Sequence, residues 1–206
     1  PRAVVVSYRL GGTDGVSIEA EKWSWALGQL GFNVRRVAGE ILDAGHPSDL
    51  IVPGLALDAE HAPDREDVAD SLGDADLVVV ENLCSLPLHE QATRVVGDVL
   101  QRRGGRVLLH HHDLPWERRR FENVRGVPPD ITGALHVTIN ERAQMELADR
   151  GIHAVRIPNM FDPGEPDGDR EGTRAVVGFE PDDVVLLQPT RAIERKNLPA
   201  GLRFGA

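Results

Sequence analysis

The sequence predicts an α/β fold with a doubly wound, mostly parallel, Rossmann-like sheet. Short apolar runs rich in valine and leucine recur along the 206 residues, helical patterns stand between them, and glycines mark many of the junctions. Hydrophobic residues make up 41% of the chain, which is enough for a core and excludes disorder as the overall state. Sheets of this kind bind ligands at the carboxyl ends of their strands, so chemically capable residues are expected there.

The predicted elements alternate along the chain. Each strand is a short apolar run, and each helix has apolar residues at helical spacing, as Trp23, Leu27 and Leu30 illustrate. The predicted strands are 3–8, 33–37, 77–80, 106–110, 134–138, 153–157 and 184–187. The predicted helices are 17–30, 64–72, 89–103 and 141–150, and Asn140 is placed to cap the last of them.

The local composition of the chain indicates where one domain ends and the next begins. Residues 162–172 are polar and rich in turn formers, which is typical of a linker. We therefore expect one Rossmann-like domain over residues 1–172, and a linker with the start of a second domain over 173–206. No apolar run approaches the roughly 18 residues that span a bilayer, and the first residues lack the pattern of a secretory signal. The lone Cys84 excludes an intrachain disulfide, so we expect a cytoplasmic protein, and peripheral membrane contact stays open.

The charge is unevenly spread. The formal net charge of -10 disfavours a general nucleic-acid binder, which usually has a basic balance. Residues 40–81 hold twelve acidic side chains against one arginine, whereas residues 102–125 hold seven arginines against three acids. An anionic ligand is therefore compatible with the second segment, despite the acidic total.

A glycine-rich turn follows the first predicted strand. Gly11, Gly12 and Gly15 allow backbone N–H groups to approach a ligand, and the following helix presents its positive end. This arrangement suits a phosphate or a sugar hydroxyl. It fits neither the dinucleotide fingerprint nor a P-loop, and a simple tight turn with positive φ is the alternative.

Histidines crowd the end of the strand at 106–110. On a strand, His110 and His112 point to one face and His111 to the other, with Asp113 at the mouth. A histidine there can bond a substrate hydroxyl or exchange a proton near neutral pH. His110 and His112 are also capable of binding a metal, but a zinc site needs a third protein ligand, and no such motif is present. Structural histidines are the remaining alternative.

Two cations follow the strand at 184–187. Arg191 and Lys196 stand five residues apart at a predicted helix start, which is a natural clamp for a diphosphate. Lys196 is one of only two lysines in the chain. A solvated charged loop is the alternative.

These segments together resemble the retaining glycosyltransferases of family 4, which have the two-domain GT-B fold. The matching pieces, in order, are Gly11-Gly12, ENLCSLP at 81–87, the HxHD run at 110–113, IPN at 157–159, and Arg191 with Lys196. The resemblance covers the amino-terminal domain and only the first strand and loop of the donor-binding domain. The Glu-x7-Glu element of the family should lie beyond Lys196, so the resemblance implies that this chain is an incomplete portion, inactive alone.

The resemblance also implies roles. His112, with His110 as the fallback, matches the histidine that contacts the sugar or acceptor at the reacting centre. Gly11, Gly12, Arg191 and Lys196 match the groups that bind the donor diphosphate. Candidates for the acceptor side are Asp113, Trp116 and Asn82. The family needs no metal and no cofactor, and its co-substrate is a nucleotide diphosphate sugar.

The leading interpretation is a retaining glycosyltransferase that moves a hexose from a nucleotide diphosphate sugar to an acceptor hydroxyl. Fixed cations would stabilise the charge that develops on the leaving diphosphate. The expected partners are the sugar donor, a hydroxyl-bearing acceptor and the missing carboxy-terminal domain. Two alternatives stay open, a ligand-binding or interaction module without catalysis and a metal-dependent hydrolase that uses the histidine-rich strand end.

Overall fold

The structure, a computed structural model, describes residues 1–43, 45–161, 164, 168–190 and 192–205. It divides into two compact units, Pro1–Met160 and Phe161–Ala206, each described here by itself. The predicted division into a domain over 1–172 and the start of a second domain over 173–206 stays a prediction. Within the described ranges, no helix is both long enough and apolar enough to cross a bilayer.

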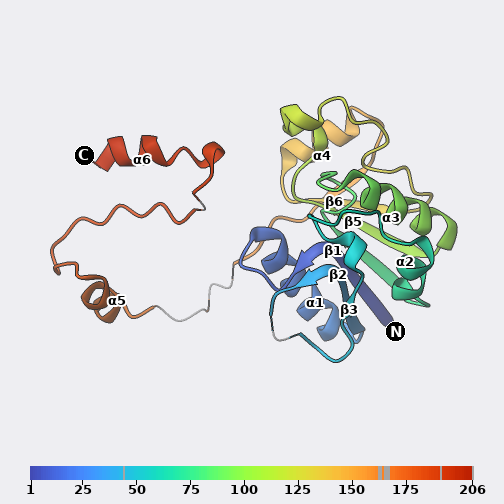
Figure 1. Cartoon of the computed structure of the whole chain (residues 1–206), viewed down its shortest axis with the longest axis horizontal. Coiled ribbons are helices and arrows are strands. Elements are labelled where there is room, and N and C mark those ends of the chain that lie inside the picture. The colour runs from blue at the N-terminus through green and yellow to red at the C-terminus, as the bar shows by residue number, and fades with distance from the viewer. Residues whose placement is uncertain (44, 162–163, 165–167, 191, 206) are drawn as a thin grey trace. The chain divides into compact units, whose positions relative to one another are not determined.

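One seven-stranded sheet forms the centre of the first unit (Figure 1), and every neighbouring pair in it is parallel. The strand order is β3-β2-β1-β4-β5-β6-β7. Helices follow most strands, so the predicted doubly wound α/β class is confirmed. The strands are β1 (Arg2–Leu10), β2 (Asn33–Ile41), β3 (Leu50–Ile51), β4 (Leu77–Glu81), β5 (Arg106–His111), β6 (Leu135–Thr138) and β7 (Ala154–Arg156).

The strand order reverses at β1. From β1 the chain passes through α1 (Gly15–Gln29) to β2 and β3 on one side, then crosses back to β4 and continues outward. The crevice above the carboxyl ends of β1 and β4 is therefore the switch point of the sheet. Open α/β sheets bind their ligands at such a point.

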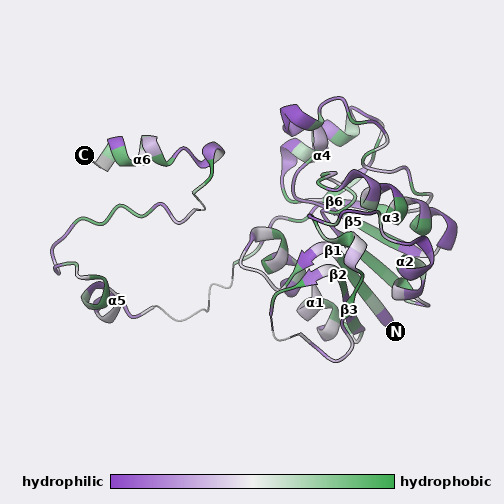
Figure 2. Ribbon diagram, in the orientation of Figure 1, coloured by the Kyte–Doolittle hydropathy of each residue, from purple (hydrophilic) through white to green (hydrophobic). Residues whose placement is uncertain are grey.

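Two apolar layers cover the sheet. Alternate residues of β1 point to opposite faces, as the pleat requires: Val4 and Val6 pack with α2 (Arg65–Leu72) and α3 (Glu90–Arg103), whereas Val5 packs with α1. Figure 2 shows the hydrophobic colour concentrated on the strands and the hydrophilic colour on the outer helix surfaces. The remaining helix of this unit, α4 (Glu141–Ala148), packs against β6 and β7 and has its own small cluster with Leu114.

In the first unit, the observed elements agree with the predicted ones within a few residues, except in the segment after residue 37. β2 extends to Ile41, because β1 itself continues to Leu10 and the two strands pair along their whole length. The short β3 and a 3₁₀ helix at Pro53–Leu55 follow. Gly39 makes this close packing feasible, since an added Cβ would lie 1.9 Å from the backbone nitrogen of Ala56. Two further 3₁₀ helices occur at Pro115–Glu117 and Arg119–Phe121.

The second unit contains α5 (Arg170–Val177), a 3₁₀ helix at Glu194–Lys196 and α6 (Leu198–Gly205). The predicted strand at 184–187 is wrong, because these residues form neither strand nor helix. A parallel strand needs a neighbour to complete its hydrogen bonds, and the described part of this unit supplies none. Apolar side chains consequently stay uncovered, as Val184 and Leu187 show with exposures of 89% and 80%.

Candidate functional site

The carboxyl ends of four strands bring polar residues and the glycine turn of the first unit to one edge of the sheet. The glycine turn follows β1, Glu81 ends β4, the histidine run ends β5, and Asn140 follows β6. Their strands are neighbours in the order β1-β4-β5-β6. Residues far apart in the sequence are therefore placed side by side by parallel pairing alone.

In the glycine turn after β1, positive φ occurs at Gly11 but not at Gly12 or Gly15, which fits the alternative of a simple tight turn. Gly11 has φ +71°, and an added Cβ would lie 2.6 Å from Cγ of Asp43, so only glycine fits. Asp14 caps α1 by accepting hydrogen bonds from the amides of Val16 and Ser17. A carboxylate thus already occupies the first turn of this helix. A phosphate would have to meet the backbone around Gly11 and Gly12 instead, and that role stays a prediction.

Glu81 is the residue that sequence analysis missed. It is fully buried at the end of β4, and its Oε2 accepts hydrogen bonds from Nδ1 of His110 at 2.9 Å and from Nε2 of His112 at 3.1 Å. Burial acts to raise the pKa of Glu81, but the bonds from the two histidines outweigh it and hold the pKa below its usual range. The sequence did contain a sign of this role, because Glu81 directly follows the apolar run at 77–80. A carboxylate buried at the end of such a strand needs hydrogen-bonding partners.

His110 and His112 lie on the same face of β5, as predicted. Their rings are 4.6 Å apart, and the His110 ring also lies 4.8 Å from the ring of Trp23 on α1. His110 is 1% exposed, whereas His112 at the strand mouth is only partly buried. His112 is thus the less buried of the two, with its side chain 7% exposed, and the assignment of a ligand contact to it stays a prediction.

His111 points to the opposite face, also as predicted. Its Nδ1 lies 2.5 Å from Oγ of Ser85, and its Nε2 lies 2.9 Å from Nδ1 of His136. Burial chiefly lowers the pKa of His111 well below its usual value, and the nearby His136 adds to the effect. His111 is therefore neutral at physiological pH and belongs to the core, not to the strand mouth.

Asn82 shapes the loop that carries His112 and Asp113. Its backbone adopts the left-handed conformation with φ 58°, which asparagine tolerates better than most residues. Its Oδ1 accepts hydrogen bonds from the backbone amides of His112 at 3.1 Å and Asp113 at 3.2 Å. The side chain is thus engaged in holding the loop, and direct contact with an acceptor stays a prediction.

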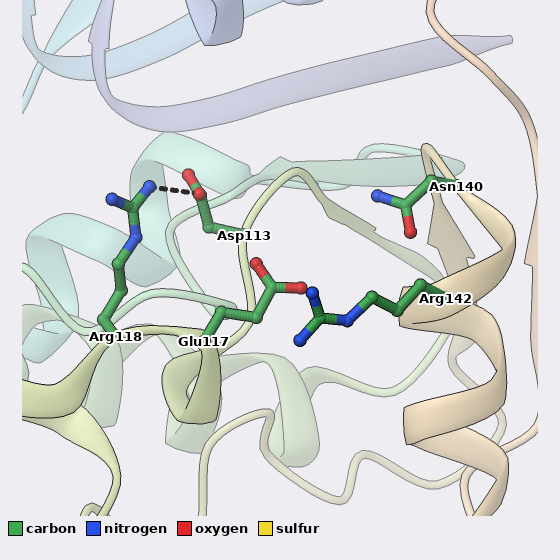
Figure 3. A pocket seen from close by; sticks show the side chains of 5 residues that line it. All are labelled: Asp113, Glu117, Arg118, Asn140 and Arg142. Carbon is green, nitrogen blue, oxygen red and sulfur yellow. Dashed lines mark hydrogen bonds and ion pairs between the residues drawn. The ribbon is translucent and has the colours of Figure 1, made fainter. Parts of the chain in front are cut away.

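A cavity of about 470 Å³ opens beside this loop (Figure 3). Asp113 is ion-paired with Arg118, and the Glu117 carboxylate points toward the guanidinium of Arg142. Burial raises the pKa of Glu117, and the negative charge of Asp113 adds to this. The lining residues come from the loop after β5 and from the start of α4, and they are Asp113, Glu117, Arg118, Asn140 and Arg142.

Arg142 uses only one of its side-chain nitrogens as a donor within the described part of the chain. Its Nε donates to Oε1 of Glu146 at 2.8 Å, and its terminal nitrogens make no hydrogen bond to any residue that the structure describes. Asn140 caps α4 through Oδ1, which accepts from the amide of Ala143 at 2.8 Å. Sequence analysis recognised this cap but not the cavity, because the cavity joins the ends of two different strands.

Trp116 lies outside the cavity lining. Its Nε1 donates to Oε2 of Glu146 at 2.7 Å, and the guanidinium of Arg150 lies 3.7 Å from its ring. It therefore helps to dock the loop on α4, and its predicted contact with an acceptor is untested.

The predicted diphosphate clamp falls in the second unit. Lys196 ends the 3₁₀ helix at Glu194–Lys196, and its carbonyl accepts a hydrogen bond from Nε2 of Gln188 at 2.9 Å. Its side chain is exposed. Arg191 lies outside the described residues. The role of this pair stays a prediction.

Three side chains at the strand mouth have the chemistry of metal ligands. One ligand atom from each of Glu81, His110 and His112 lies within 4.8 Å of the others. Glu81 is thus the third protein ligand that the sequence pattern lacked. The same atoms are already joined by hydrogen bonds, so two arrangements compete for them, a proton network and a bound cation.

Comparison with known proteins gives two curated relatives that bear the same name. No family model matches the chain. It is 30% identical to the mannosylglucosylglycerate synthase of Thermotoga maritima over an alignment of 236 positions, which covers 96% of this chain and 54% of the relative. It is 28% identical to the mannosylglucosylglycerate synthase of Petrotoga mobilis, with 93% of this chain and 53% of the relative covered. The chain spans about half the length of the curated relatives it matches.

Proposed function

We propose that this chain is part of a retaining glycosyltransferase that moves a hexose from a nucleotide diphosphate sugar to an acceptor hydroxyl. The observation that carries the proposal is the similarity of nearly the whole chain to two synthases of a mannosylated product. The parallel sheet supports it, with polar side chains at the carboxyl ends of β1, β4 and β5 where such folds bind ligands.

The transferred group and the acceptor follow from the names of the relatives. The relatives are named as synthases of mannosylglucosylglycerate, so we propose for this protein a mannosyl donor and a glucosylglycerate-like acceptor. Such an acceptor carries sugar hydroxyls and one carboxylate. The cavity beside Asp113 offers matching groups, because carboxylates and an amide bond hydroxyls and a guanidinium bonds a carboxylate.

The proposal divides the work between two domains. The first unit would hold the acceptor, with His112 at the reacting centre as the proposed catalytic contact. The second unit would begin a donor-binding domain, in which Arg191 and Lys196 stabilise the leaving diphosphate. The uncovered apolar side chains of Val184 and Leu187 support this, since a complete parallel sheet would bury them. No metal or cofactor is required in this scheme.

A donor and acceptor screen tests the proposal. The full-length protein is incubated with the mannose and glucose conjugates of GDP, UDP and ADP, each with glucosylglycerate and, as the neutral control, glucosylglycerol. We expect a transferred mannosyl group, faster transfer to the acid, and a product of the same anomeric configuration as the donor. Absence of transfer from every donor would contradict glycosyl transfer, and an inverted product would contradict retention.

A metal-dependent hydrolase is the second candidate, and one observation favours it. Glu81, His110 and His112 together supply two imidazoles and one carboxylate, a ligand set that zinc accepts. Metal analysis of the purified full-length protein decides between the two. Stoichiometric zinc, with activity that chelation abolishes, would support this candidate over metal-independent glycosyl transfer.

A further inference from the structure

The Glu81 carboxylate joins two histidines through a single oxygen. Oε2 of Glu81 lies 2.9 Å from Nδ1 of His110 and 3.1 Å from Nε2 of His112. Glu81 is 0% and His110 1% exposed, so water does not compete for these bonds. The backbone also holds Glu81 in place, because Oγ of Ser7 donates to its carbonyl at 2.9 Å. This is a rigid, buried arrangement directly beneath the strand mouth.

An ionised carboxylate only accepts hydrogen bonds, so both ring nitrogens that face Glu81 must carry a proton. His110 is then protonated on Nδ1 and His112 on Nε2. In their neutral forms, the two neighbouring histidines are thereby held as opposite tautomers by one acid. A carboxylate that faces an imidazole N–H is a common device for fixing ring orientation and increasing the basicity of the opposite nitrogen.

The opposite nitrogens differ in their surroundings. Nε2 of His110 is buried and has no partner among the described residues. Nδ1 of His112 also makes no hydrogen bond in the described part of the chain, but the His112 side chain at the strand mouth is 7% exposed, against 1% for His110. Nδ1 of His112 is therefore a free acceptor at the carboxyl edge of the sheet, next to the loop that carries Asp113.

We propose that Glu81 is a positioning residue, which fixes His112 as the Nε2–H tautomer and leaves its Nδ1 to accept a hydrogen bond from a hydroxyl of the bound sugar. This inference rests on the proposed glycosyl transfer and assigns a role within the same site. His112 touches the ligand, whereas Glu81 acts only through His112. His110 completes the arrangement by filling the second acceptor position of Oε2 and packing against Trp23.

The proton network and a metal site demand opposite protonation. A cation would bind the lone pairs of the same ring nitrogens that now donate to Glu81, so their protons would have to leave. Measuring where the protons lie therefore separates the two arrangements. The measurement also needs no substrate, so it is independent of whether the protein transfers a sugar.

The first experiment is an NMR measurement of histidine tautomers in the uniformly ¹⁵N-labelled 206-residue chain. Multiple-bond ¹H–¹⁵N spectra identify which nitrogen of each ring is protonated. We expect Nδ1–H for His110 and Nε2–H for His112, both unchanged when zinc chloride is added at one equivalent. Rapid exchange of either ring between tautomers, or zinc-dependent loss of either N–H, would overturn the proposal.

The second experiment measures kinetics of Glu81→Gln in the full-length protein. Glutamine preserves the volume but retains only one accepting oxygen and adds an N–H donor, so the tautomer of His112 is released. We expect kcat to fall about tenfold or more with KM for the acceptor within about twofold. The control is Glu19→Gln, which alters another buried glutamate that contacts neither histidine and pairs with Lys22.

The two experiments can contradict the positioning role of Glu81 and the proposed function independently of each other. Unchanged kcat in a folded Glu81→Gln protein overturns the positioning role, even if the tautomers are as expected. Equal losses in Glu81→Gln and Glu19→Gln also overturn it, because they indicate general damage from a buried amide. If the wild-type protein transfers no sugar but shows the expected tautomers, the proposed function fails while the hydrogen-bond arrangement stands.

Discussion

Nε2 of His111 lies 2.9 Å from Nδ1 of His136, and their rings stack with an interplanar angle of 16°. With Ser85 at the other end, the pair forms a hydrogen-bonded chain on the face of β5 opposite to Glu81. One strand thus has two separate polar networks, one at the strand mouth and one in the core. The core network makes the folded state sensitive to acid.

We predict that the protein loses stability as pH falls from about 7 to about 5. Burial lowers the pKa of His111 and of His136, although Asp130 partly offsets the effect at His136. The unfolded chain then binds more protons than the folded one below the usual histidine pKa of about 6.5, and stability decreases there. Glu81 has a lowered pKa, so its contribution is lost only below the usual carboxyl range.

Urea unfolding at several pH values measures this loss. In His136→Asn the slope of the free energy of unfolding between about pH 7 and pH 5 should be smaller, because one depressed group is gone. His61→Gln is the control, since His61 is exposed. A wild-type stability that stays flat over this range would contradict the prediction.

Tyr8→Phe should destabilise the fold by about 1–2 kcal/mol. The Tyr8 hydroxyl is buried, bonds Oγ1 of Thr93 at 2.7 Å and donates toward the carbonyls of Leu83 and Leu86, and its pKa is raised to about 12 chiefly by burial. Removal of the oxygen takes a buried hydrogen-bond partner from the Thr93 hydroxyl, whereas the carbonyls of Leu83 and Leu86 keep Oγ1 of Thr93 and the amide of Leu88 as donors. Chemical denaturation measures the loss, and a stability equal to wild type would show that these hydrogen bonds contribute nothing net to the fold.

Gly39→Ala should cost more than about 3 kcal/mol or prevent folding. The new Cβ would lie 1.9 Å from the Ala56 nitrogen, and backbone atoms cannot move aside as a flexible side chain can. The matched control is Gly28→Ala in the exposed part of α1, where nothing lies within 4 Å of the new Cβ. That change should stabilise the helix by about 0.5–1 kcal/mol, and both variants are compared by thermal denaturation.

Arg142→Gln should raise KM for glucosylglycerate about tenfold in the full-length protein, which is the loss of one charge-assisted contact. KM for the neutral glucosylglycerol should stay within about twofold. The control is Arg94→Gln, because Arg94 forms a comparable exposed (i, i+4) ion pair with Glu90 on α3. An equal increase in KM for glucosylglycerate and for glucosylglycerol would show that Arg142 does not recognise the carboxylate.

Lys196→Ala should lower kcat of the full-length protein about a hundredfold, the size expected for one group that stabilises developing charge. Lys196→Arg keeps the charge and should recover part of the rate. Initial rates at saturating donor and acceptor give both values. Wild-type kcat in the alanine variant would exclude Lys196 from the diphosphate clamp.

The sequence was sufficient for the fold class and for the order of the strands along the chain in the first unit. Alternation of apolar runs and helical patterns predicted the parallel sheet, and the two-residue period of β5 separated His111 from His110 and His112. The Glu81 contact was not predictable in the same way, because it depends on the pairing of β4 with β5, in which Glu81 is level with His110. The cavity at Arg142 depends likewise on which strand end lies beside which.

The predicted strand at 184–187 shows a different limit. Its apolar composition favours a strand, but a strand of a parallel sheet exists only with its neighbour. The local pattern therefore indicates only the preference of this segment for a strand. Whether a strand forms depends on a neighbouring strand, which the described part of the second unit does not contain. The glycine turn shows the reverse case, in which a local requirement for positive φ at Gly11 was sufficient.

The central position of β1 has a consequence for synthesis. β1 pairs with β2 on one side and with β4 on the other, and β4 ends only at Glu81. The ribosome makes β1 first and β2 next, so one edge of β1 has its partner early, whereas the other edge has none until the acidic segment before β4 has also been made. The open edge of β1 is thus exposed for part of synthesis, and we expect the negative charge of that segment to disfavour association of nascent chains during this time.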